Sequence, residues 1–154
     1  MKLAQLNIAK TKYPLDRPEI KDFVDNLDKV NGIAESSEGF IWRLKEESGN
    51  ATDIRVFDDP DMIVNMSVWQ NAESLKDFMF HTLHREFMAR KKEWFERLKE
   101  DSYVLWWIED GRIPTLEEAL ERLEHLRQHG DTPYAFSFKS NFTEADLHAY
   151  EVNR

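Results

Sequence analysis

The sequence predicts an α+β fold, in which strands and helices alternate along one domain. Segments with an apolar residue at every second position alternate with segments whose apolar residues follow the spacing of a helix. The chain has 154 residues and no cysteine, and a single domain of this length buries an adequate core without disulfides. Prolines, glycines and capping residues separate the segments. We therefore expect a cysteine-free domain built around a sheet.

The first half of the chain has the pattern strand, helix, strand, strand. Residues 2–10 alternate, with Ala4, Leu6 and Ile8 on one face. Pro18 stands where a helix start tolerates proline, and apolar positions then follow helical spacing. The predicted elements are a strand at residues 2–10, a helix at 19–36, a strand at 40–45, a short strand at 54–57 among turn residues and a strand at 62–69.

The second half adds a helix, a strand and a further helix. Asn71 is a suitable N-cap for a helix that includes Leu75 and Phe78 and that either continues to residue 98 or is followed by a second helix. Residues 103–108 are apolar on both faces, which predicts a strand that is buried on both sides. Thr115 caps a last helix that ends at Gly130. Residues 134–138 alternate again and predict an edge strand or a swapped arm.

This order of elements is the ferredoxin-like βαββαβ arrangement with a C-terminal helical extension. Such a sheet has its helices on one face and leaves the other open. Because several strands are apolar on both faces, we expect the open face to pack against a second copy, in a homodimer. We assign residues 1–138 to one domain and expect residues 139–154 to form a loosely ordered tail.

Composition removes several classes of function. The formal net charge of −9 disfavours binding to nucleic acid or to an anionic membrane surface. Neither a signal peptide nor an apolar run long enough to span a membrane is present, so a cytoplasmic location is expected. The glycine-rich phosphate-binding motifs are also missing from the sequence.

The segment from Met62 to Phe78 resembles the strand-Trp-x-x-x-Glu-x-Leu-x-x-Phe passage of the dimeric α+β barrel superfamily. That superfamily includes the antibiotic biosynthesis monooxygenases and small haem-degrading oxygenases. Residues 39–44, 104–107 and 114–119 are similar to an uncharacterised bacterial branch of it. The resemblance spans residues 1–138 and implies a dimeric α+β barrel. It specifies function poorly, because one fold hosts many activities.

The same resemblance makes His84 and Asn7 candidate catalytic residues. The haem-degrading relatives supply an axial His from the corresponding helix and an Asn from the first strand, so haem is a candidate cofactor, held by His84. The match is partial, since His84 stands early and the relatives' helix Trp is Phe78 here. The alternative is a His that only bonds a backbone carbonyl. His81 and His84 share a helix face at this spacing, but we predict no metal site there.

A few polar residues on otherwise apolar strands suggest a small-ligand pocket. Asn65, Ser67 and Asn7 would form it together with Trp69 and Phe78, while Arg43 would anchor an acidic group. In cofactor-free oxygenases of the superfamily, such groups bind a phenol or quinol that itself reacts with O₂. We expect binding of a small planar apolar ligand, aromatic or haem, with an oxygenase role. The alternative is a non-catalytic homodimeric protein whose core its own side chains close.

Overall fold

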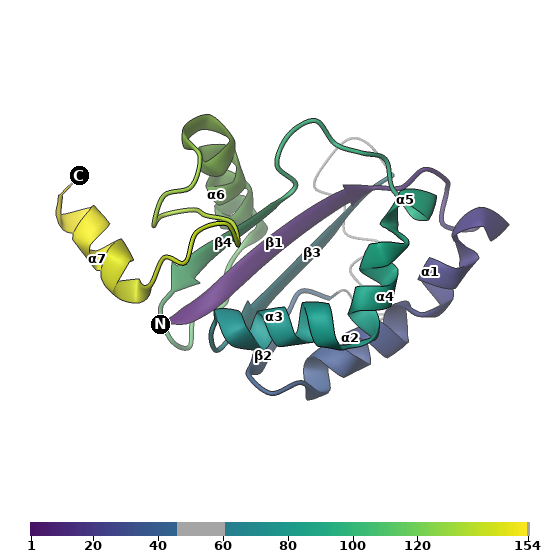
Figure 1. Ribbon diagram of the computed structural model, residues 1–154, viewed down its shortest axis with the longest axis horizontal. Coiled ribbons are helices and arrows are strands. Elements are labelled where there is room, and N and C mark those ends of the chain that lie inside the picture. The colour runs from purple at the N-terminus through teal and green to yellow at the C-terminus, as the bar shows by residue number, and fades with distance from the viewer. Residues whose placement is uncertain (46–60, 154) are drawn as a thin grey trace.

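A four-stranded antiparallel sheet forms the centre of the computed structural model, which describes residues 1–45 and 61–153 (Figure 1). The strands are β1 (Lys2–Lys10), β2 (Phe40–Arg43), β3 (Met62–Trp69) and β4 (Tyr103–Ile108). Their order is β2-β3-β1-β4, which is the ferredoxin-like order. The α+β fold class is therefore confirmed. The short strand predicted at 54–57 lies outside the described residues.

The predicted helices form, but the two longest are broken. The helices are η1 (Pro18–Ile20), α1 (Lys21–Asp25), α2 (Leu27–Ser36), α3 (Ala72–His81), α4 (Leu83–Ala89), α5 (Lys91–Trp94), α6 (Leu116–His129) and α7 (Glu144–Val152). Asn26 interrupts the first with ψ near 1°, and Thr82 interrupts the second with an extended backbone. The Thr82 side chain then caps α4. In the part of the chain described, no helix is long and apolar enough to cross a membrane.

Helices cover both faces of the sheet. On one face Leu3, Trp69 and Leu105 pack with residues of α2 and α3. On the other face α6 packs its apolar stripe against alternate residues of the strands, and the buried residues of that cluster expose 4% or less of their surface. Figure 1 shows α3 crossing the sheet on one side and α6 lying on the other. The expectation of an open second face is therefore wrong, because the same chain supplies α6 to cover it.

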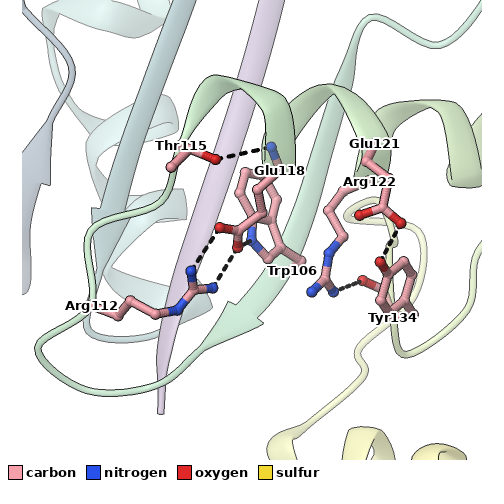
Figure 2. A network of polar contacts seen from close by, with 7 residues as sticks. All are labelled: Trp106, Arg112, Thr115, Glu118, Glu121, Arg122 and Tyr134. Carbon is pink, nitrogen blue, oxygen red and sulfur yellow. Dashed lines mark hydrogen bonds and ion pairs between the residues drawn. The ribbon is translucent and has the colours of Figure 1, made fainter.

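Polar contacts hold α6 against the sheet (Figure 2). The buried Trp106 Nε1 donates to Glu118 Oε2 at 2.9 Å, and Arg112 donates to both oxygens of that carboxylate at 2.8 and 2.6 Å. Arg122 Nη1 donates to the Tyr134 carbonyl at 2.7 Å, and its guanidinium lies 3.7 Å from the centre of the Tyr134 ring. These contacts join α6 to β4 and to the segment of residues 131–142, which we call the strap.

The strap extends the sheet within the same chain. Phe136 exchanges two backbone hydrogen bonds with Leu105, at 2.8 and 2.9 Å, so it pairs with the free edge of β4. After the strap, residues 139–154, for which we expected a loosely ordered tail, include the helix α7. Thr143 and Asp146 form a reciprocal capping box at the start of α7, and Leu147 of that helix exposes only 3% of its surface.

Candidate functional site

Four polar side chains lie together on the sheet face that α2 and α3 cover. Strand pairing sets Ser67 opposite Gln5 and Asn65 opposite Asn7, so all four point to the same side. Gln5 and Ser67 are buried, with 8% and 7% exposed, whereas Asn7 and Asn65 are exposed. We call Gln5, Asn7, Asn65 and Ser67 the polar floor. The polar floor is therefore accessible to solvent at the two asparagines and buried at Gln5 and Ser67.

Hydrogen bonds fix the direction of the groups in the polar floor. Gln5 Nε2 donates to Asn65 Oδ1 and to Ser67 Oγ, each at 2.7 Å. Trp69 Nε1 donates to the same Ser67 oxygen at 2.8 Å. A hydroxyl oxygen accepts two hydrogen bonds, so the remaining capacity of Ser67 is to donate its own proton. The Asn65 amide, whose oxygen is used, likewise has its NH₂ group left to donate.

Aromatic rings in successive contact lie beside the polar floor. The Trp69 and Phe78 rings stack with centroids 5.3 Å apart and planes at 25°, and Phe40 packs edge-on against Trp69 at 5.4 Å. Trp69 exposes 1% of its surface and Phe78 exposes 8%. On its other side Phe78 meets the His84 ring, with centroids 4.9 Å apart. The order of contacts is therefore Ser67, Trp69, Phe78, His84.

His84 lies in the first turn of α4 and is largely shielded from water. The Thr82 hydroxyl accepts the His84 backbone N–H at 3.2 Å, and His84 Nδ1 lies 3.4 Å from the Met79 carbonyl oxygen. Burial lowers the pKa of His84 below its ordinary value of 6.5, and the Met79 contact opposes this shift. The ring is therefore neutral at pH 7, with Nδ1–H toward Met79 and Nε2 left as an acceptor.

The spacing of His81 and His84 predicted that they share one helix face. In the structure they belong to two different helices. The break at Thr82 places His81 at the end of α3 and His84 in α4. His81 is exposed and lies 4.0 Å from Asp77. Within the described residues, no three His, Cys, Asp or Glu side chains gather closely enough to hold a metal ion.

Arg43 stands in the same row as the polar floor but is bonded to an acid. It pairs in register with Ser67, and its Nε donates to Glu35 Oε1 of α2 at 2.8 Å. The Arg43 side chain is only 10% exposed, and its hydrogen bond lowers the pKa of Glu35. A hollow of about 240 Å³ lies along the β2 edge, lined by Glu35 and residues 40–45. Any acidic ligand group must compete there with Glu35.

The residues around His84 do not fit a haem. A ligating His commonly bonds a carbonyl through its other nitrogen, as His84 does with Met79. A porphyrin also needs a flat space beside that imidazole. Here Phe78 lies between His84 and Trp69, in contact with both rings, so the chain's own side chains fill the gap between helix and sheet. We therefore derive no chemistry through haem.

The structure links five of the seven residues singled out from sequence, namely Asn65, Ser67, Trp69, Phe78 and His84, in one chain of contacts in which Gln5 bridges Asn65 and Ser67. Asn7 lies beside Asn65, and Arg43 beside Ser67. The sequence reasoning missed Gln5, which joins Asn65 to Ser67. Its signal was present, because Gln5 and Asn7 alternate with apolar residues on β1 as Asn65 and Ser67 do on β3.

The sequence reasoning also missed Tyr103, which lies on β4 at the Asn7 end of the polar floor. It lies opposite Asn7 across the β1–β4 pair. Its hydroxyl accepts the backbone N–H of Phe138 at 3.1 Å, and the two rings lie 5.8 Å apart. The strap thus places a second aromatic pair beside the polar floor, on the side away from Trp69. A strand residue with this role carries no local signal, because the strap that meets it is 35 residues away.

Comparisons with known proteins show which structures the chain is similar to. A protein of unknown function from Nitrosomonas europaea is 12% identical, with a TM-score of 0.48 over 74% of this chain and 95% of that one. A mutant of SnoaB, a cofactor-independent oxygenase from Streptomyces nogalater, is 10% identical, with a TM-score of 0.47 over 74% and 98%. A candidate antibiotic biosynthesis monooxygenase from Chloroflexus aurantiacus is 16% identical, with a TM-score of 0.45 over 73% and 97%.

Two of these solved structures are described as an oxygenase or a monooxygenase. Such low identities carry no information on activity. No curated protein matches the chain significantly. A family model does match, and it covers residues 2–152, which include the strap and all of α7 as well as the sheet. The chain therefore belongs to the family described as a domain of unknown function (DUF3291).

Proposed function

We propose that the chain binds a small planar organic ligand that presents an acceptor oxygen to the polar floor. The observation that carries this proposal is the double acceptance at Ser67, whose oxygen takes hydrogen bonds from Gln5 and Trp69. Ser67 and Asn65 are then left as neighbouring donors, one buried and one exposed. Two such donors in a mostly apolar surrounding recognise a phenolate, enolate or carboxylate oxygen.

The surroundings of the polar floor favour a flat and largely apolar body for that ligand. Trp69, on which Phe78 stacks, borders the floor at Ser67, and Tyr103 with Phe138 borders it at Asn7. Aromatic side chains on two sides offer stacking or edge-on contact to a planar ring. A negative charge on the ligand gains little from Arg43, because Arg43 is already paired with Glu35.

An oxygenase role is the activity that the resemblance to the barrel superfamily implies. In that proposal the ligand is an electron-rich phenol or quinol, and its own ring supplies the electrons that reduce O₂. Asn65, Ser67 and Asn7 stabilise its anionic oxygen. Trp69 and Phe78 separate His84 from Ser67, so we do not place His84 in contact with the ligand.

One observation favours the alternative of a non-catalytic binding or assembly protein. Trp69 and Phe78 are almost fully buried and stack on each other, so they fill space that a ligand would otherwise enter. Under this alternative the polar floor only satisfies the buried indole N–H of Trp69. The two readings differ in whether the floor takes part in binding.

Titration with 1-naphthol separates them. The proposal predicts that the wild-type protein quenches naphthol fluorescence to saturation and that Ser67→Ala binds more weakly. The control is Gln128→Ala, at an exposed position of α6. Oxygen uptake in the presence of a naphthohydroquinone, measured with an electrode, tests the oxygenase role separately. Absence of binding to the wild type contradicts the proposal. Binding without oxygen uptake contradicts only the catalytic part.

We further propose that the chain forms a homodimer, as its resemblance implies, through a surface other than the α6-covered face. That face is already buried within one chain. Light scattering at micromolar concentration is expected to give twice the mass of the chain. The mass of a single chain would contradict the dimer.

A further inference from the structure

We infer that Gln5 is a positioning residue, which holds Ser67 and Asn65 as donors so that the site prefers the anionic form of its ligand. This inference rests on the proposed function. It concerns a residue that donates a hydrogen bond to each of the two binding groups and that we do not place against the ligand. Its role is to set which way those groups face.

The geometry assigns this role because both hydrogens of the Gln5 amide are used. One bonds Asn65 Oδ1 and the other bonds Ser67 Oγ, each at 2.7 Å, in a position where Gln5 is 8% exposed. The Trp69 indole N–H can only donate, so it independently requires Ser67 Oγ to accept. With both lone pairs of Ser67 occupied, its hydroxyl proton has no role except donation away from Gln5.

A carboxylate at position 5 would reverse the arrangement with little change of shape. A Glu side chain accepts and does not donate, so Ser67 O–H and the Asn65 NH₂ would turn inward to it. The ligand oxygen would then lose both donors and meet a nearby negative charge. Gln5→Met, in contrast, keeps the length of the side chain and removes both donors, so it releases the two groups without reversing them.

The ionisation of a bound coloured phenol reports this difference directly. We choose 4-nitrophenol as the probe, because its anion absorbs visible light and its proton is released to water on ionisation. Its pKa is measured free and at saturating wild type, Gln5→Glu, Gln5→Met and the control Gln128→Met. We expect wild type and control to lower the pKa of the bound probe by about one unit, a tenfold preference for the anion. Gln5→Met should bring the bound pKa near the free value, and Gln5→Glu should raise it above.

A measurement on the wild-type protein alone tests the inference even if the Gln5 variants fold poorly. The two side-chain N–H protons of Gln5, followed by nuclear magnetic resonance, should exchange with water at least tenfold more slowly than those of Gln128, because both are bonded and buried. Equal exchange rates would overturn the inference without any substitution.

The outcomes separate the inference from the proposed function. If 4-nitrophenol binds the wild type and keeps its lowered pKa in both Gln5 variants, Gln5 does not position the donors, and the proposed binding site stands. If it binds with an unchanged pKa in the wild type, the donors do not face the ligand and the inference is again wrong. If neither it nor 1-naphthol binds at all, the proposed function itself fails.

Discussion

Ser67→Ala removes the one atom on which the polar floor depends, and its cost can be worked out from the contacts. Ser67 Oγ accepts from Trp69 Nε1 at 2.8 Å and from Gln5 Nε2 at 2.7 Å. After the substitution the Trp69 indole N–H is left without its acceptor in a side chain that is 1% exposed. A buried donor without an acceptor costs about 1–3 kcal/mol. Gln5 keeps its bond to Asn65, so we expect a total loss of about 2 kcal/mol, mostly from Trp69.

Urea unfolding followed by circular dichroism measures this loss. At typical denaturant slopes of about 1–3 kcal/mol per molar urea, the midpoint should fall by roughly 1 M. In Trp69→Phe the unsatisfied donor is absent, so adding Ser67→Ala to it should cost about 1 kcal/mol less than in the wild type. If Ser67→Ala costs under about 0.5 kcal/mol, or if the two substitutions are additive, the hydrogen bond from Trp69 does not contribute as argued.

Three further predictions follow from other parts of the chain. Glu118→Gln should make the free energy of unfolding less dependent on pH in the acid range. Burial alone would raise the pKa of Glu118, but its hydrogen bonds from Arg112 and Trp106 lower that pKa overall. The stabilisation from the Glu118 carboxylate is therefore fully present above pH 4.5 and is lost as pH falls through the lowered pKa, which urea midpoints at neutral and acid pH will show. Burial lowers the pKa of His84, so the stability of the wild type should fall as pH drops below 6.5, and His84→Asn should reduce that fall. If the free energy of unfolding depends on pH equally in the two proteins, the ring is not buried as described. Leu123→Ala, at a position 2% exposed between α6 and the sheet, should cost about 2–5 kcal/mol in urea unfolding, and a loss below about 1 kcal/mol would contradict the packing of α6 on that face.

The sequence pattern predicted the strands and the α+β order well, because alternation is strong where one strand face meets a helix. Residues 62–69 and 103–108 coincide with β3 and β4. The helix break at Asn26 was not predicted, since helical spacing of apolar residues continues across it. A second helix after the one that Asn71 caps was left open, but its start at Thr82 was not located. The position of α6 was also not predictable. Its apolar stripe, with Leu123 at its centre, shows that it packs on something, but not on which face or in which chain.

The site was predictable in its residue types and not in its connections. Polar residues on apolar strands identified Asn65, Ser67 and Asn7, because their alternation places them on one face. Nothing local indicated that Gln5 would bond two of them, since hydrogen bonds between strands 60 residues apart depend on register. Nor could spacing show that Phe78 would fill the gap beside His84, which is what excludes haem from this arrangement.

Side-chain nuclear magnetic resonance on the wild-type protein tests the central claim most directly, namely that the polar floor binds a planar ligand through an acceptor oxygen. The Asn65 NH₂ and the Trp69 indole N–H would be followed while 1-naphthol is added. The account predicts that both resonances shift together and saturate at one affinity, while those of Gln128 stay in place. If they remain unchanged while naphthol binds elsewhere, or if nothing shifts at all, the polar floor is a structural network and the proposed ligand site does not exist.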